Sequence, residues 1–556
     1  MKRSTAAALF GILLLAVIVR VWPLLDNTYW GSDVGEYYAL TRALAEDGSL
    51  PRGYMGWGVA YPYFPGLFVV NGAFVLAGMA PSAAVSGIVP VLAALGVLPM
   101  FLMAARVTGD DRAGLLAAAF LAVLMFHVFP TSHAIPAALG DFLLLGALLL
   151  FLLLPRAPNA FPLLVLAGLA VVATHHFATY ALLLFCAATL VLRALLHRGL
   201  TVRDIRRELA FVGILAGTTL AYWAWYATPI WTAIIPTSSL SGTAVIALAA
   251  SAVLAPLLVI QLRRRTSWRF VPRIRDARAA GIATGLAFAT SLAFVVVTAT
   301  ASVPGTSLRV DFAGVPLYLP MLAFIALSAA GRRTMDLTRE GVAVTAWFVA
   351  LCGSLVLGLM AAPIVLIPAR QLEYFSIPFA IMVGAGFRWV TLGAEGRTRF
   401  AATAIAVLLI AASALASYPP PAGLGHREGI DARTVQAALW LRVHGGGLVA
   451  ADHRVSTVVF GFGGEDATWD REARFWHTTN LTDALAAMDG VPLPRGTADV
   501  EWIVIDADTR EGVMLSPFEP ALPLAPAEEV KFTGPPFHKL FDSGFAQVYW
   551  LNRGLA

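Results

Sequence analysis

Apolar runs long enough to cross a lipid bilayer recur along the chain from Thr5 to Ser417. A helix of about 20 apolar residues spans the hydrocarbon core of a membrane. The chain is 58% hydrophobic and only 13% charged, with a mean hydropathy of +0.75, a composition that soluble globular proteins do not require. The sequence therefore predicts a polytopic α-helical membrane protein with about 13 transmembrane helices.

Arginine side chains mark one side of this predicted bundle. Basic loops at 193–207, 263–278, 332–333 and 388–399 all fall on the same side as the N-terminal Met-Lys-Arg. Positive charge gathers in cytoplasmic loops, so we expect a multi-pass protein of the cell membrane with a cytoplasmic N-terminus. The alternative of a signal peptide is disfavoured because no small-residue cleavage site follows the first apolar run. Charge spread over loops in this way predicts no nucleic-acid partner.

A Tyr-Pro-Pro-Pro stretch at 418–421 divides the chain. Residues 1–418 are expected to form the transmembrane domain, with a first outer loop at 26–63 and a short interfacial segment at 64–80. Residues 419–556 have a more polar composition and are expected to form a small α/β domain on the extracytoplasmic side.

Short apolar stretches in this last part are typical of buried strands, and two of them end in Asp. We predict strands at 447–452, 501–506 and 547–551, and helices at 435–443 and 482–488.

Two carboxylates stand among aromatic residues in the first outer loop. Asp33 and Glu36 are flanked by Trp30, Tyr37 and Tyr38, which would hold the acids against the membrane interface. A carboxylate in such a place can act as a general base or hold a divalent cation. We predict Asp33 as the catalytic base, and Glu36 and Tyr37 as substrate contacts. We also consider Asp33 and Glu36 as ligands of Mg²⁺ or Mn²⁺. The alternative is that both acids are merely solvated.

Two arginines lie within or at the outer ends of apolar runs. A charge at membrane depth costs about 2.5 kcal/mol or more and normally marks a partner or a site. Arg20 could equally extend outward to water. Arg370 stands one helical turn before Glu373 and could pair with it, or its guanidinium could hold the phosphate of a lipid substrate. We take Arg370 and Glu373 as candidate substrate-binding residues.

Three histidines lie at predicted outer turns. His175 and His176 stand between two apolar runs, and His133 precedes an Ile-Pro pair. Adjacent residues on a helix point in different directions, so a two-histidine metal site is disfavoured. We predict instead that His175, His176 and His133 contact substrate or its phosphate.

Other polar or reactive residues receive simpler interpretations. Arg309 and Asp311 are expected to form an ion pair in an outer loop. Cys186 and Cys352 both lie in apolar runs, where an isolated cysteine usually serves packing.

Several stretches together resemble the GT-C glycosyltransferases, and most closely the oligosaccharyltransferase catalytic subunits and their archaeal and bacterial relatives. Asp33 stands at the position of the family's first-loop acid. The stretches are 32–38 (Ser-Asp-Val-Gly-Glu-Tyr-Tyr), 61–67 (Tyr-Pro-Tyr-Phe-Pro-Gly-Leu), 113–119, 370–374 with Pro378, and 440–442. The resemblance implies a GT-C fold and transfer of a sugar from a polyprenyl-phosphate donor. It further implies that Asp33 deprotonates the acceptor hydroxyl, that Arg370 holds the lipid phosphate, and that the anomeric configuration is inverted.

The sequence departs from that family at two places. Where the oligosaccharyltransferase motif Trp-Trp-Asp-Tyr-Gly is expected, residues 451–455 read Ala-Asp-His-Arg-Val. The second acidic motif is also missing, because no carboxylate follows residue 131 until Asp141. These departures disfavour a peptide-acceptor pocket and a complete metal site.

We therefore expect a membrane glycosyltransferase that uses a polyprenyl-phosphate-linked sugar and a glycan, lipid or protein acceptor on the extracytoplasmic face. The alternatives are oligosaccharyltransferase-like transfer to protein, a flippase or transporter of lipid-linked sugars, and an inactive membrane scaffold. A transporter would place ionisable residues near the middle of several helices, whereas here polar residues gather at the outer ends.

Overall fold

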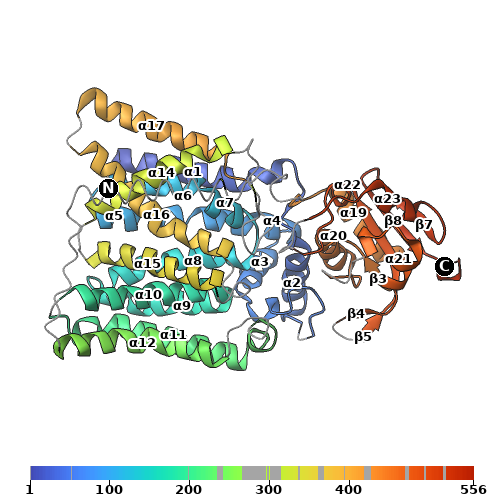
Figure 1. The fold of residues 1–556 in the computed structure, drawn as a ribbon, viewed down its shortest axis with the longest axis horizontal. Helices are drawn as coiled ribbons and strands as arrows, with labels where there is room; N and C mark the ends of the chain where they lie inside the picture. The colour runs from blue at the N-terminus through green and yellow to red at the C-terminus, as the bar shows by residue number, and fades with distance from the viewer. Residues whose placement is uncertain are drawn as a thin grey trace.

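A long bundle of helices carries a smaller unit with a mixed sheet at one end (Figure 1). The computed structural model describes residues 2–51, 53–197, 199–234, 242–265, 296, 300, 315–335, 339–360, 368–392, 395–418, 427–469, 475–493, 496–516 and 521–555. The two chain termini lie at opposite ends of the molecule, with α2 and α3 between the bundle and the terminal unit (Figure 1).

The bundle consists of helices whose breaks fall at recognisable residues. Pro136 opens α8, where proline is tolerated because the first helical N–H needs no partner within the helix. His175 has extended backbone angles and separates α9 from α10. The helices are α1 (Arg3–Val21), α4 (Pro81–Ala94), α5 (Val97–Thr108), α6 (Asp111–Val123), α7 (Met125–Ser132), α8 (Pro136–Leu153), α9 (Phe161–Thr174), α10 (His176–Leu196), α11 (Arg206–Trp225), α12 (Gly242–Arg265), α14 (Val315–Thr334), α15 (Arg339–Met360), α16 (Pro368–Thr391) and α17 (Gly396–Leu415).

Six helical segments in the described ranges are long and apolar enough to cross a membrane, or seven if the bent pair α6–α7 is one span. The chain is therefore a multi-pass membrane protein. The predicted count of about 13 spans remains a prediction. The two helices of that pair, α6 and α7, are bent by 56° relative to each other. The interfacial segment contains α3 (Gly66–Leu76), which at 11 residues is too short to span.

Arg20 is buried inside the bundle, so the interpretation that it extends to water is wrong. Its Nε donates to Thr131 Oγ1 at 3.0 Å, and its Nη2 lies 2.7 Å from His127 Nδ1. His127 Nε2 in turn lies 2.7 Å from Asp141 Oδ2. These groups lie near the ends of α1, α7 and α8, so a hydrogen-bonded network that links three helices satisfies the buried charge.

The terminal unit is built on a four-stranded sheet with the order β3-β6-β8-β7. Strand β3 runs parallel to β6, and the other two pairings are antiparallel. The three predicted strands and two predicted helices of this part are confirmed within a few residues. The elements are β2 (Gly429–Ile430), α19 (Ala432–His444), β3 (Leu448–Ala450), α20 (His453–Val458), the π-helical η7 (Val459–Gly463), α21 (Leu481–Ala487), β4 (Val491–Leu493), β5 (Gly496–Ala498), β6 (Val500–Asp506), α22 (Ala507–Glu511), α23 (Pro526–Glu529), β7 (Phe537–Asp542) and β8 (Ala546–Leu551).

The first outer loop and the terminal unit share one hydrophobic core. Strand β1 (Tyr29–Trp30) pairs antiparallel with β2. Tyr37 and Leu40 of α2 (Val34–Asp47) belong to the same buried cluster as Val85 of α4 and Val455 of α20. This cluster fixes α2 against both the membrane helices and the terminal unit.

Gly35 of α2 allows the closest approach in this interface. A Cβ atom on Gly35 would lie 1.8 Å from the carbonyl oxygen of Thr457, and one on Gly461 would lie 2.0 Å from the carbonyl oxygen of Gly35. Only glycine leaves room for the two backbones to touch here. The glycine of the Ser-Asp-Val-Gly-Glu stretch is thus required by packing.

The buried pair Arg454–Asp506 is expected to stabilise the terminal unit. Arg454 Nη2 donates to Asp506 Oδ1 at 2.6 Å, and Thr434 Oγ1 donates to Asp506 Oδ2 at 2.9 Å. Arg454→Ala leaves a buried carboxylate without its counter-charge, so we expect the free energy of unfolding to fall by about 3–5 kcal/mol. Chemical denaturation of the full chain in detergent, followed by tryptophan fluorescence, measures this change.

The matched control is Arg433→Ala, which removes an exposed arginine paired with Asp431. Exposed pairs contribute little, so this variant should unfold like the wild type. Equal losses in the two variants would contradict the assigned role of the buried pair.

Candidate functional site

Asp33 stands at the N-terminus of α2, where the chain leaves β1 and turns into the helix. Its carboxylate meets one side chain of the terminal unit, one from later in the first outer loop and one from α2 itself. His453 Nε2 donates to Asp33 Oδ1 at 2.9 Å. Tyr61 Oη donates to Oδ2 at 2.9 Å, and Tyr37 Oη lies 3.3 Å from the same oxygen. The site therefore combines the first outer loop with the terminal unit.

Burial and hydrogen bonding shift the pKa of Asp33 in opposite directions. Burial alone would raise its pKa, but the hydrogen bond and charge of His453 and the hydrogen bond from Tyr61 bring the pKa below the ordinary value. Asp33 is therefore ionised at neutral pH. The Ser32 hydroxyl also donates to Asp33 Oδ1, at 3.5 Å.

His453 is fully buried, whereas the side chain of Asp33 is 16% exposed. The ring of His453 also packs edge-on against Trp57, with the ring centres 5.0 Å apart. A molecule that approaches from solvent can therefore reach Asp33 and cannot reach His453 directly. This difference makes Asp33 the candidate base and His453 the residue that positions it.

Glu36 lies one helical turn after Asp33 but in a different environment. It is fully buried, and both carboxyl oxygens accept from the backbone N–H of Gly58, at 3.3 and 3.2 Å. Burial and the nearby negative charge of Asp33 raise the pKa of Glu36 to about 8. At neutral pH this carboxyl group holds a proton.

The divalent cation predicted at Asp33 and Glu36 stays a prediction, and both oxygens of Glu36 already accept from the Gly58 N–H. In the described ranges no group of three or more His, Cys, Asp or Glu residues has the geometry of a metal site.

A second group of predicted residues surrounds the start of α16. Arg370 is exposed there, and its positive charge acts on Tyr37, His175 and His176. Tyr37 is thus in hydrogen-bond range of Asp33 and in the electrostatic field of Arg370.

The histidines at the α9–α10 junction differ in their contacts. His175 is buried and its Nδ1 accepts from the Ala178 N–H at 3.3 Å, so it caps α10. His176 is half-buried, and its ring centre lies 5.6 Å from that of Phe64. Of the two, His176 has the more accessible ring.

In the described part of the chain, neither Glu373 nor His133 forms a hydrogen bond or ion pair with Asp33, and His133 Nε2 lies 3.7 Å from Glu428 Oε2. Glu373 is buried, and within the described part of the chain it forms no ion pair with Arg370. His133 Nδ1 lies 2.7 Å from the Phe129 carbonyl oxygen, and its ring stacks on Trp30. The pair predicted from Arg309 and Asp311 lies outside the described residues.

His453 and Tyr61 are the residues that the sequence did not single out as functional. Asp452, which ends the predicted strand at 447–452, caps α20 by accepting from the Val455 N–H at 2.9 Å. The available signal was that a histidine follows the end of a buried strand, where side chains often reach sites. Nothing in the sequence indicated that this histidine meets Asp33.

Glu36 is expected to make the folded chain less stable as pH rises. In the unfolded chain its carboxyl group loses its proton near pH 4.5, whereas in the folded chain it keeps the proton up to about pH 8. The folded state therefore binds more protons between these values, so stability falls across this range by a few kcal/mol, at about 1.4 kcal/mol per pKa unit. Asp33 adds no slope above pH 5 because its pKa is lowered.

Thermal unfolding midpoints from pH 5 to pH 8 test this expectation. Glu36→Gln should flatten the dependence, whereas Glu46→Gln, an exposed acid on the same helix, should leave it unchanged. An unaltered slope in Glu36→Gln would show that another group titrates.

The comparisons with known proteins bear on the fold. No family model matches the sequence, and no curated protein sequence matches it. The solved structures that match include the oligosaccharyltransferase of Archaeoglobus fulgidus in its apo form, at 16% identity and a TM-score of 0.61, over 92% of this chain and 70% of that one.

Two complexes of oligosaccharyltransferases from the same archaeon also match. The complex with Zn and sulfate gives 15% identity and a TM-score of 0.60, over 90% of this chain and 68% of that one. The complex of AglB with an inhibitory peptide and a dolichol-phosphate matches at 14% identity and a TM-score of 0.58, over 91% of this chain and 70% of that one. The predicted resemblance is thus confirmed at the level of the fold: this chain shares the fold of the archaeal oligosaccharyltransferase structures.

Proposed function

We propose that this protein is a membrane glycosyltransferase that moves a sugar from a polyprenyl-phosphate donor to an acceptor hydroxyl group. The observation that carries the proposal is the ionised and partly exposed carboxylate of Asp33, held by His453 and Tyr61. The fold supports it, because a structural neighbour was solved with a dolichol-phosphate. We further propose that the site lies on the extracytoplasmic side, as the arginine distribution predicts.

In the proposed reaction the acceptor oxygen attacks the anomeric carbon of the donor sugar. The acceptor proton passes to Asp33, a new C–O bond forms, and the bond between the anomeric carbon and the phosphate oxygen breaks. Polyprenyl phosphate leaves with the electron pair of that bond. Because attack and departure occur on opposite faces of the carbon, its configuration is inverted.

Arg370 is proposed to bind the donor phosphate. It is exposed at the start of α16, and a guanidinium group matches the geometry of phosphate oxygens. A cation there would also stabilise the negative charge that grows on the leaving phosphate. His176, beside Arg370 and less buried than His175, is the histidine best placed to contact the same group.

His453 is proposed to keep Asp33 ionised and oriented. Its hydrogen bond favours the charged carboxylate, which is the form able to accept a proton. Asp33 is therefore ionised, and able to accept a proton, at a pH at which the neighbouring Glu36 is still neutral.

Sugar transfer by the full chain in proteoliposomes tests the function, with a panel of radiolabelled polyprenyl-phosphate sugars as donors. Asp33→Asn removes the proton acceptor, so we expect the rate to fall by roughly 10²–10⁴-fold. Asp47→Asn changes an exposed acid at the other end of α2 and should retain the wild-type rate. Full turnover by Asp33→Asn would overturn the mechanism, and inactivity of the wild type with every donor would overturn the function.

The pH dependence of the same rate tests the role of His453. Loss of its hydrogen bond raises the pKa of Asp33, so the acidic limb of the rate profile should move to higher pH in His453→Ala. His453→Gln retains a donor and should shift less. An acidic limb that stays at the wild-type pH in His453→Ala would contradict the role of His453.

A further inference from the structure

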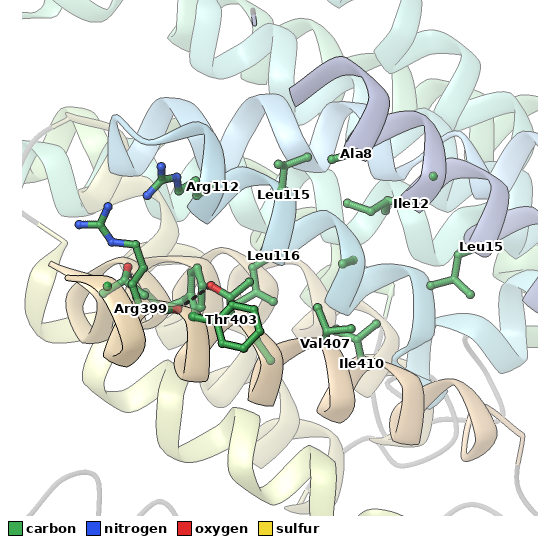
Figure 2. A pocket seen from close by; sticks show the side chains of 17 residues that line it. Ala8, Ile12, Leu15, Arg112, Leu115, Leu116, Arg399, Thr403, Val407 and Ile410 are labelled. Carbon is green, nitrogen blue, oxygen red and sulfur yellow. Dashed lines mark hydrogen bonds between the residues drawn. The ribbon is translucent and has the colours of Figure 1, made fainter. Parts of the chain in front are cut away.

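An apolar groove lies at the end of the bundle opposite the terminal unit. It has a volume of about 880 Å³ and runs between α1, α6, α16 and α17 (Figure 2). Apolar side chains such as Ile12, Leu116 and Ile410 form most of its walls. Helix α17 lies at the edge of the bundle (Figure 1) and leaves much of its apolar surface exposed, including Phe400 and Val407.

Two arginines stand at one end of this groove. Figure 2 shows Arg112 of α6 and Arg399 of α17 with their guanidinium groups toward the same end, away from Leu15 and Ile410. In the described ranges no carboxylate lies within ion-pair distance of Arg112. The nearby Asp110 accepts instead from the Arg112 backbone N–H at 2.8 Å. The groove therefore joins an apolar channel to a cationic end.

The length of the groove matches one leaflet of a bilayer. Its wall on α17 extends from Gly396 to Ile410, which is about 21 Å at 1.5 Å per residue. Half of a bilayer with its headgroups measures about 20–22 Å, whereas a transmembrane helix needs about 30 Å. A leaflet lipid fits this length, and a spanning helix of a partner protein does not.

We propose that the groove binds one anionic glycerophospholipid. Its acyl chains lie along the apolar walls, and its phosphate lies between Arg112 and Arg399. The charge of the two arginines favours an anionic headgroup. The length of the groove favours a lipid of the leaflet at the end of the bundle opposite the terminal unit. This site is separate from Asp33 and does not depend on the proposed sugar transfer.

Native mass spectrometry of the full chain tests the proposal by titration with phosphatidylglycerol, phosphatidylcholine or polyprenyl phosphate. The wild type should retain one phosphatidylglycerol per chain in preference to the other two. A basic residue near an anionic lipid surface contributes about 1 kcal/mol, so the Arg112→Ala/Arg399→Ala variant should bind it roughly 30-fold more weakly. Arg203→Ala/Arg207→Ala, which changes two exposed arginines elsewhere, should bind like the wild type.

Gly11→Phe tests the apolar part of the site separately. A Cβ on Gly11 meets no atom within 4 Å, and Gly11 lines the groove, so the new ring should fill the space without disturbing the helices. It should abolish retention of the lipid with the thermal midpoint unchanged. Undiminished phosphatidylglycerol binding in either groove variant would overturn the proposal. Equal binding of phosphatidylcholine, or preference for polyprenyl phosphate, would also overturn it.

Discussion

The hydrogen bond between His453 and Asp33 joins two segments that are 420 positions apart in the sequence. It can form only if the first outer loop and the terminal unit keep a fixed register. Several contacts set that register: Ser32 N–H donates to Glu428 Oε2 at 2.9 Å, Thr457 Oγ1 donates to the Ser32 carbonyl at 2.6 Å, and β1 pairs with β2. The contact of Gly35 with Thr457 brings the two backbones together. The terminal unit is therefore part of the site.

Two carboxyl groups one helical turn apart have opposite protonation states because their partners differ. Asp33 receives hydrogen bonds from His453 and Tyr61 and stays ionised, whereas Glu36 is buried deeper, beside the negative charge of Asp33, and stays neutral. A protonated Glu36 also avoids a second buried negative charge, which would otherwise compete for the same stabilising groups. Of these two carboxyl groups, the negative charge therefore lies on the one that solvent can reach.

The sequence predicted those features that depend on local pattern. Apolar runs predicted the helices, and short apolar stretches predicted the strands around 448–450, 500–506 and 546–551. Aromatic neighbours indicated that Asp33 would not be freely solvated. The pairing of His453 with Asp33 could not be predicted, because it depends on how two distant segments dock. The contacts of Arg20 with His127 and Thr131 likewise depend on how distant helices pack, so the local sequence does not predict them.

We propose that Asp33 and Arg370 serve the same transfer step. Asp33 takes the proton of the acceptor that attacks the anomeric carbon, and Arg370 binds the phosphate that leaves it. A structure of the full chain with a non-hydrolysable polyprenyl-phosphate sugar analogue tests this claim most directly. The account predicts that the anomeric carbon lies beside the exposed face of Asp33, with the phosphate against Arg370. An analogue bound with its phosphate away from Arg370 and its sugar out of reach of Asp33 would contradict it.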